Sequence, residues 1–231
     1  MTARQNLLLA ALPASDLERL MPDLKLVSLS SGQPLYQSDA PFRHVYFPID
    51  SIVSLLNVAQ DGVSTEMAIV GNEGVLGVSM LTGGGARSNR AVVLSGGNAY
   101  RLNGMLLQAE FHRAGRMQHL LLRYMQSLLT QIAQTVVCNR FHCLDQQLCR
   151  WLLMSLDRLP SNDFVVTQEF IASILGVRRE SVNEAANHLK QAGLIQCSRG
   201  HIMVINRLGI ETRACECYGA VKHELDRLLI H

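Results

Sequence analysis

Residues 167–206, which read TQEFIASILGVRRESVNEAANHLKQAGLIQCSRGHIMVIN, decide the fold of the second half of this 231-residue chain. Ala172, Gly176 and Val182 follow the spacing A-x3-G-x5-V. That spacing is typical of two helices joined by a sharp turn, with a small residue where the helices touch, a glycine in the turn and an apolar anchor on the second helix. Five more apolar residues complete one buried face at helical intervals: Ile171, Leu175, Val177, Ala186 and Leu189. We therefore expect a helix-turn-helix.

The second of these helices presents a polar surface near its start. Its exposed residues are Arg178, Arg179, Glu180, Ser181, Asn183 and Glu184. In helix-turn-helix proteins, this end of the second helix enters the major groove of DNA. Gly193 then ends the helix, and two short apolar strands flank a turn, which is the pattern of a winged helix with Arg199 and His201 at the wing tip. The segment predicts a DNA-binding module; the alternative is a small helical subdomain whose arginines are only solvated.

The charge of the chain is small overall and concentrated in this segment. Lys and Arg number 21 against 19 Asp and Glu, for a net charge of +2. Between residues 178 and 207, the basic residues are Arg178, Arg179, Lys190, Arg199 and Arg207, against Glu180 and Glu184. Such a local concentration of charge is more typical of a sequence-specific DNA-binding module than of a nonspecific one, because a nonspecific module depends on many phosphate contacts.

The first half of the chain, residues 1–115, reads as β-structure with almost no helix. Residues 24–29 alternate between apolar and polar, and residues 51–58 and 63–70 flank a hairpin turn at Asp61 and Gly62. Residues 91–94 and 99–102 continue the pattern on either side of a glycine-containing turn. Many short strands with such turns predict a jelly-roll β-roll.

A jelly roll can also carry a metal-dependent enzyme, which needs clustered histidine and carboxylate ligands. Before residue 110 the only histidine is His44, and neither a G-x-S-x-G motif nor a phosphate-binding glycine loop occurs in the chain. We expect no enzyme activity and no catalytic residues.

All six cysteines lie between Cys138 and Cys217, without paired zinc-ligand spacing. We expect reduced, buried thiols, with no metal and no cofactor. The alternative is a metal or redox sensor built on two groups: Cys138, His142, Cys143 and Cys149 in the middle of the chain, and the Cys215-Glu-Cys217 run near its end. The apolar run within residues 1–13 is too short to span a bilayer, so we expect a cytoplasmic protein with no membrane contact.

Residues 116–137 contain neither glycine nor proline and predict one long helix between the two halves. Leu121, Met125, Leu128 and Ile132 recur at steps of +4, +3 and +4, which predicts a seam for the same helix of a second subunit. Further apolar residues widen the stripe enough to cover the β-roll as well. The alternative is a helix packed only within its own subunit. The chain thus divides into a β-roll (1–115), a dimerisation helix (116–137) and a winged-helix domain with a helical tail (138–231).

This arrangement resembles the Crp/Fnr superfamily of bacterial transcription regulators over nearly the whole chain, most specifically in the R-E-S-V run from Arg179. The resemblance implies an α+β fold: an N-terminal jelly roll, a long dimerisation helix and a C-terminal winged helix-turn-helix. It also implies a homodimer that binds a two-fold operator on double-stranded DNA, with RNA polymerase as partner. Arg179 and Glu180 are then expected to contact base edges, with Thr167 and Ser181 close to phosphates. The competing interpretation is a dimeric small-ligand-binding protein whose winged helix is vestigial or makes protein contacts.

Glu184 stands where the family often has another base-reading arginine. This departure means that the family's best-known operator sequence does not carry over to this chain.

The effector site of nucleotide-binding relatives is only partly matched. In them, a glycine-framed short helix and an arginine hold the cyclic phosphate, and a glutamate holds the ribose. Gly74, Val75 and Gly77 supply the glycine frame but put valine at the glutamate position. For the phosphate, the candidates are Arg87 with Ser88, or Arg90. Because valine cannot accept a hydrogen bond, we expect the β-roll to be structural or to bind something other than cyclic AMP. The substitute acceptor under a shifted alignment is Glu73.

Overall fold

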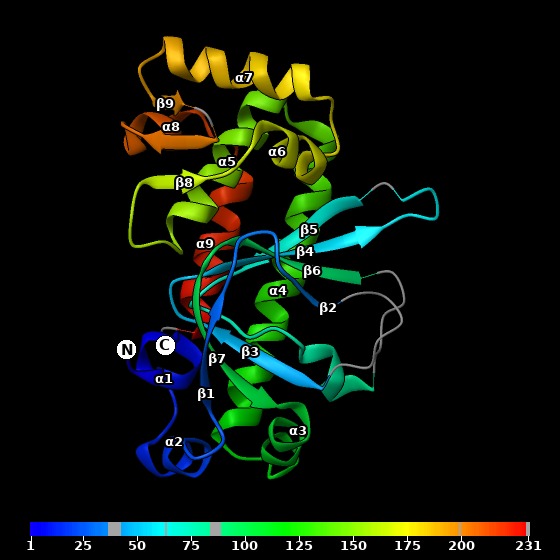
Figure 1. Cartoon of the computed structure of the whole chain (residues 1–231), viewed down its shortest axis with the longest axis vertical. Helices are drawn as coiled ribbons and strands as arrows, with labels where there is room; N and C mark the ends of the chain where they lie inside the picture. Colours follow the sequence, from blue (N-terminus) through cyan, green and yellow to red (C-terminus); the bar gives the residue numbers. More distant parts are fainter. Residues whose placement is uncertain (37–42, 63, 84–88, 199, 230–231) are drawn as a thin grey trace.

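In the computed structural model, which describes residues 1–36, 43–62, 64–83, 89–198 and 200–229, the first half of the chain forms two antiparallel sheets (Figure 1). One sheet has the strand order β1-β7-β3 and the other the order β2-β6-β4-β5. The strands are β1 (Lys25–Leu29), β2 (Pro34–Tyr36), β3 (His44–Pro48), β4 (Ile52–Val58), β5 (Ser64–Val70), β6 (Asn89–Ser95) and β7 (Gly97–Asn103). The predicted β-roll is confirmed.

Alternation of apolar residues builds the interior of this roll. Val45 and Phe47 of β3 point inward and are fully buried, as is Leu102 of β7 opposite them. The predicted turn between β4 and β5 contains Gly62 at φ +85, a backbone conformation that glycine adopts without a steric penalty. Strands β6 and β7 follow one another in sequence but belong to different sheets, so the chain crosses from one sheet to the other at Gly96.

Short helices close the roll, contrary to the expectation of almost no helix in this half. They are η1 (Ala3–Gln5), α1 (Leu7–Ala10), α2 (Ala14–Leu20), η2 (Val78–Thr82) and α3 (Gly104–His112). The Asn6 side chain accepts a hydrogen bond from the Leu9 amide and donates to the carbonyls of Pro48 and Gly74, at 3.0 and 2.8 Å. These helices are stabilised by tertiary contacts of this kind, because elements so short have little intrinsic stability.

Helix α4 (Arg116–Phe141) runs beside the roll and on into the second half of the chain. Leu120 and Tyr124 pack into the core of the roll, and the Gln131 side chain exchanges two hydrogen bonds with the backbone of Ile69 in β5. The helix extends beyond the predicted end at residue 137, because the chain first becomes extended at His142. No helix in the described ranges has the length and apolar character to cross a bilayer.

The second half is the predicted winged helix-turn-helix. Its elements are α5 (Leu144–Leu156), β8 (Asp163–Val165), α6 (Gln168–Leu175), α7 (Arg179–Gln191), β9 (Ile195–Ser198), β10 (His201–Val204), α8 (Arg207–Arg213) and α9 (Glu216–Leu229). Strand β8 pairs with β10 and enlarges the predicted two-stranded wing to the order β8-β10-β9. Helix α9 returns along α4 toward α1, and near its end the Arg227 carbonyl accepts a hydrogen bond from Arg123 of α4.

The two halves share a buried junction. Ile52, Ile69 and Leu94 of the roll belong to the apolar core of the winged-helix half. Beside them lies an ion pair between Arg158, which follows α5, and Glu73, which follows β5, at 2.8 Å with each side chain only 4% exposed. The winged helix is therefore fixed against the roll in this structure by apolar and ionic contacts.

Candidate nucleic-acid interface

The turn between α6 and α7 is built as the sequence spacing predicts. Thr167 caps α6, since its side chain accepts a hydrogen bond from the Phe170 amide at 3.1 Å. Gly176 ends the helix at φ +66, and the Val177 amide donates to the Ala172 carbonyl at 3.0 Å. A side chain at the glycine position would be strained. This turn fixes where α7 begins, whereas a contact of Thr167 with phosphate remains a prediction.

Helix α7 buries one face and exposes the other. The buried residues are Val182, Ala185, Ala186 and Leu189. The exposed face carries Arg179, Asn183, Asn187 and Lys190, which lie on one side because they are three or four residues apart.

The remaining predicted contact residues lie at or beside the start of α7. Arg178 is the N-cap residue rather than part of the helix. Arg178 and Glu180 are exposed, and Ser181 is half-buried. Their backbone amides lie at the positive end of the helix dipole, which favours a negatively charged partner.

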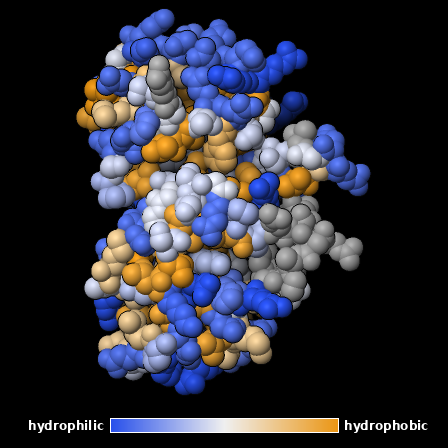
Figure 2. All heavy atoms as spheres, in the orientation of Figure 1, coloured by the Kyte–Doolittle hydropathy of each residue, from blue (hydrophilic) through white to orange (hydrophobic). Residues whose placement is uncertain are grey.

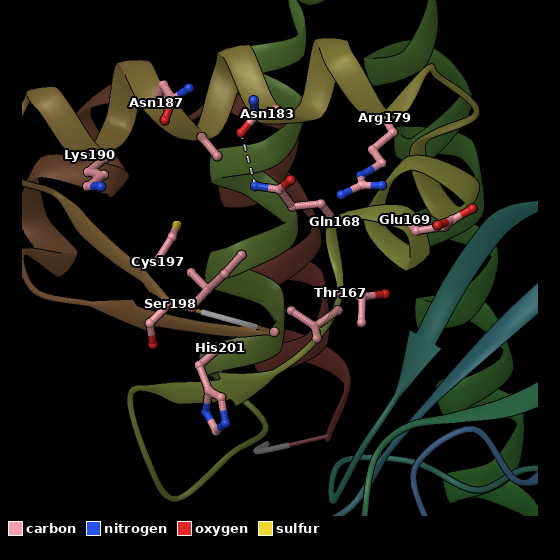
Figure 3. A pocket seen from close by; sticks show the side chains of 14 residues that line it. Thr167, Gln168, Glu169, Arg179, Asn183, Asn187, Lys190, Cys197, Ser198 and His201 are labelled. Carbon is pink, nitrogen blue, oxygen red and sulfur yellow. Dashed lines mark hydrogen bonds between the residues drawn. The ribbon is translucent and has the colours of Figure 1, made fainter.

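A polar groove of about 640 Å³ lies between α7, the start of α6 and the wing. It is lined by Val166, Thr167, Gln168, Glu169, Arg179, Asn183, Ala186, Asn187, Lys190, Cys197, Ser198, Gly200, His201 and Ile202. Figure 3 shows the Gln168 side chain pointing toward Asn183. Its Nε2 donates a hydrogen bond to the side-chain oxygen Oδ1 of Asn183 at 3.2 Å. The groove joins the exposed face of α7 to the wing in one continuous polar surface.

Sequence reasoning missed several residues of this groove, among them Gln168, Asn187 and Lys190. The last two repeat the spacing of Arg179 and Asn183 further along the helix, so the exposed face could have been followed beyond Glu184. Gln168 directly follows the predicted cap and gave no comparable signal.

The wing contributes a histidine whose orientation the structure shows. His201, which is about half exposed, places Nδ1 3.5 Å from an Asp163 carboxylate oxygen. Arg199, the other residue predicted at the wing tip, lies outside the described residues. Figure 2 shows that hydrophilic residues cover the upper end of the molecule, where α7 lies.

A second surface, on α4, carries three of the four residues predicted for a dimer seam, and the dimer itself remains a prediction. Leu121 is 0% exposed and packs in the core of its own β-roll, so its assignment to a dimer seam was wrong. Leu122, Leu129 and Val136 are instead 49%, 61% and 65% exposed. Met125, Leu128 and Ile132 are partly exposed beside them, and with Leu129, Val78 and Ser79 they line an apolar groove of about 180 Å³.

The exposed seam is therefore Leu122, Met125, Leu129, Ile132 and Val136, with steps of +3, +4, +3 and +4. Only Leu121 of the four predicted residues is turned inward, and the prediction included it because the helix is apolar on two faces. A periodicity of 3.5 residues was present on each face, and the sequence did not indicate which face lies inside.

The loop proposed for an effector packs tightly against the rest of the roll. The Val75 side chain is buried in the core, and a Cβ at Gly74 would overlap the Tyr124 side chain of α4. Gly77, at φ +96, ends the loop, and Arg90 is exposed on β6. Arg87 and Ser88 lie outside the described residues.

Glu73, the substitute acceptor for a ribose hydroxyl, already has other partners. Its carboxylate accepts hydrogen bonds from Arg158 and from the Gly71 amide. The acceptor considered for a shifted alignment is thus engaged at the junction between the two halves.

Four potential metal ligands converge where α4 ends, although their spacing along the chain did not predict it. They are Cys138, His142, Cys215 and Cys217, and their ligand atoms all lie within 4.8 Å of one another. Cys143 and Cys149, considered with them from the sequence, are not members of this set. Cys143 is exposed, and Cys149 is buried in the apolar core of the winged-helix half.

Comparison with known proteins agrees with this geometry. A family model described as a Crp-like helix-turn-helix domain matches residues 146–212. No curated protein matches the chain in sequence. Among solved structures, FixK2 from Bradyrhizobium japonicum is 17% identical with a TM-score of 0.70, and the match covers 83% of this chain and 98% of that one.

Two regulators from Thermus thermophilus are similar to the same extent. A CRP-family transcriptional regulator is 19% identical, with a TM-score of 0.67 over 81% of this chain and 96% of that one. A CRP/FNR-family regulator is also 19% identical, with a TM-score of 0.62 over 82% of this chain and 98% of that one. Likeness at these identities shows a shared fold.

Proposed function

We propose that this chain, which carries a Crp-like helix-turn-helix domain on the fold of Crp/Fnr regulators, is a homodimeric, sequence-specific DNA-binding regulator of transcription. The observation that carries the proposal is the exposed polar face of α7, continuous with the groove that reaches the wing. A guanidinium and two amides along one helix face are the groups that pair with base edges in the major groove.

Each residue has a role in this proposal. Arg179 donates to guanine O6 and N7, and Glu180 accepts from a cytosine amino group. Asn183 and Asn187 present amides that suit adenine. Contacts with phosphates and sugars position the protein on the duplex; they come from the predicted residues Thr167, Arg178, Ser181, Arg199 and His201 and from Lys190 of the groove.

Dimerisation through the exposed seam on α4 brings in a second α7 helix. When two subunits pair along Leu122, Leu129 and Val136, a two-fold axis relates their α7 helices. Helix-turn-helix dimers read two half-sites about 34 Å apart, one turn of DNA. RNA polymerase is the partner that the resemblance to this superfamily implies.

Cyclic AMP is not the effector in this proposal. Val75 offers no acceptor for the ribose, and Glu73 is held by Arg158. A buried hydroxyl left unpaired costs on the order of 1–3 kcal/mol, roughly ten- to hundred-fold in affinity. Calorimetric titration tests this, and tight stoichiometric binding of cyclic AMP would contradict it.

Selection of bound duplexes from a random DNA pool tests the proposed function. We expect a two-fold symmetric sequence with half-sites one turn apart. The competing function, a ligand-binding dimer whose winged helix contacts protein, predicts no enriched sequence. Mapping of bound sites in the source genome then identifies candidate regulated genes, and transcript levels with and without the protein show whether binding activates or represses them.

A further inference from the structure

The metal-ligand set comes from two places that are distant in the sequence. Cys138 lies in the last turn of α4, and His142 follows the end of that helix. Cys215 and Cys217 lie on either side of the first residue of α9. Three of the four residues are buried, and His142 is half-buried. The fold thus concentrates three thiols and an imidazole at one point beside the connection between α4 and α5.

Two of the six distances between these ligand atoms are close to the edges of a metal-centred tetrahedron, and all six are within 4.8 Å. The Sγ atoms of Cys138 and Cys215 are 3.5 Å apart, and the Cys217 Sγ lies 3.7 Å from Nδ1 of His142. Zinc with bonds of about 2.3 Å to sulfur and about 2.0 Å to nitrogen gives tetrahedral edges of roughly 3.5–3.8 Å. A disulfide would instead bring two sulfurs to about 2.05 Å. The spacing therefore suits a shared cation better than a sulfur–sulfur bond.

The surroundings of His142 also fit a ligand. Its Nε2 lies 3.2 Å from an oxygen of the Glu216 carboxylate, so that Nδ1 is the nitrogen turned toward Cys217. Metal-binding histidines commonly donate their other ring N–H to a carboxylate, which fixes the tautomer and the ring orientation. The side-chain amide of Gln147 donates a hydrogen bond to the backbone carbonyl of His142 at 2.9 Å and holds the backbone of this loop.

A buried positive charge, Arg150 of α5, reaches α4 one turn before Cys138. The Arg150 guanidinium donates to the Thr135 hydroxyl at 2.9 Å, and Thr135 precedes Cys138 by three residues. Three thiolates and a neutral imidazole around a divalent cation carry a net charge of −1. A buried arginine nearby offsets such a charge, whose burial would otherwise be costly.

We propose that Cys138, His142, Cys215 and Cys217 bind one Zn²⁺ ion in a closed tetrahedral site. Thiolate and imidazole ligands favour zinc over calcium or magnesium, which prefer oxygen. Four protein ligands leave no open position, so the ion is structural rather than catalytic.

Zinc at this point would fasten α9 to the end of α4. The chain passes from α4 to the winged-helix half through His142 and Cys143, so the ion would stiffen the connection between the dimer seam and α7. We expect the metal-free protein to have lower operator affinity and faster amide exchange at the start of α9. Only the effect on operator affinity rests on the proposed function; the binding of zinc does not.

The experiment is metal titration of the full-length chain under reducing, metal-free conditions. With Co²⁺ as probe, we expect thiolate-to-cobalt charge-transfer and tetrahedral d–d absorption that saturates at one ion per chain. Zn²⁺ should displace this signal, and native mass spectrometry should give one zinc per chain. Absence of cobalt absorption while all six cysteines remain titratable thiols would overturn the proposal, and so would a mass lower by two hydrogens, which indicates a disulfide.

Substitutions locate the site. Cys215→Ser and His142→Asn should weaken Co²⁺ binding and change its spectrum, whereas the exposed Cys143→Ser is the matched control and should bind as the unmodified chain does. Glu216→Gln should keep the tetrahedral spectrum and lower the affinity roughly ten- to hundred-fold. Loss of binding in Cys143→Ser with retention in Cys215→Ser would place the ion elsewhere. The titration of the unmodified chain decides the question even if a variant does not fold.

Discussion

Helices α4 and α7 both bury one face in the chain itself, but they expose opposite chemistries on the other face. Helix α4 exposes Leu122, Leu129 and Val136, whereas α7 exposes Arg179 and Lys190 with two asparagines between them. An apolar stripe gains free energy when another apolar surface covers it, while a polar face stays solvated until it meets a partner of matching charge and hydrogen-bonding groups. Under the proposed function these two surfaces select different partners: a second copy of the chain for α4 and a nucleic acid for α7.

The largest effect is expected from a charge in the exposed seam. Leu129→Asp places a carboxylate on each side of the two-fold interface, and an unpaired buried carboxylate costs several kcal/mol, about 3 or more for each subunit. We expect a monomer that stays folded, because Leu129 is exposed within one chain, and that has lost operator binding. Light scattering measures the oligomeric state, circular dichroism measures whether the chain is folded, and a DNA-binding assay measures operator affinity.

The matched control is Leu121, one residue away and turned inward. Leu121→Ala should lower the free energy of unfolding by about 2–5 kcal/mol, because it leaves a cavity in the β-roll. The stability of the dimer, measured at temperatures where the variant is folded, should hardly change. The reverse result, with Leu129→Asp dimeric and Leu121→Ala monomeric, would restore the seam predicted from the sequence.

This pair of leucines also shows how far the sequence could predict the structure. The turn was predictable because Gly176 marks the end of α6. The buried face of α7 was predictable because that helix is apolar on one face only. On α4 an apolar stripe was predictable, but it was not predictable that Leu122 is exposed and Leu121 buried, because both continue an apolar row. Which row lies inside depends on contacts with the roll, which are distant in the sequence.

The convergence of the cysteines was unpredictable for a related reason. Cys138 and Cys215 are brought together only because α9 folds back along α4, and no local pattern encodes that path. The helices α1 and α3 were missed because short helices at the ends of a β-roll depend on tertiary contacts. Local patterns thus predict single elements well, but they do not predict features that depend on contacts between elements distant in the sequence.

The next largest effect is expected at the junction that holds α4 and α7 in a fixed relation. Glu73→Ala leaves the Arg158 guanidinium buried without its carboxylate, and breaking a buried ion pair typically costs about 3–5 kcal/mol. We expect destabilisation of that size in denaturant unfolding, with both halves affected because the pair joins them.

Replacing both members of the ion pair separates the cost of an unpaired charge from the worth of the pair. Glu73→Gln combined with Arg158→Met should be less destabilising than Glu73→Ala alone, because no charge stays buried. A double variant that is less stable than the single one would mean that the ion pair itself stabilises the junction strongly.

A smaller and more selective effect is expected on α7. Arg179→Ala should cost about 1–3 kcal/mol of discrimination at one guanine of each half-site. Lys190→Ala, further along the same face, should weaken binding to operator and scrambled DNA alike and reduce the salt dependence. Quantitative binding to both DNAs at several salt concentrations measures the difference. Equal losses on both DNAs for Arg179→Ala would remove it from the base-reading residues.

The last effect appears only as the pH changes, and it concerns the junction between the roll and α5. Burial raises the pKa of Glu66 to about 7 from an ordinary 4.5, although its hydrogen bond from Ser54 and the charge of Arg150 oppose the shift. The folded chain therefore holds this proton more tightly than the unfolded chain, so the stabilisation is complete below about pH 4.5 and is lost as pH rises through 7. Glu66→Gln cannot ionise and should escape that loss. Its free energy of unfolding relative to the unmodified chain should rise by about 2–3 kcal/mol between pH 5 and pH 8. Denaturant unfolding at both pH values, with the exposed Glu184→Gln as control, measures the change, and a difference independent of pH would show that Glu66 is already ionised at pH 5.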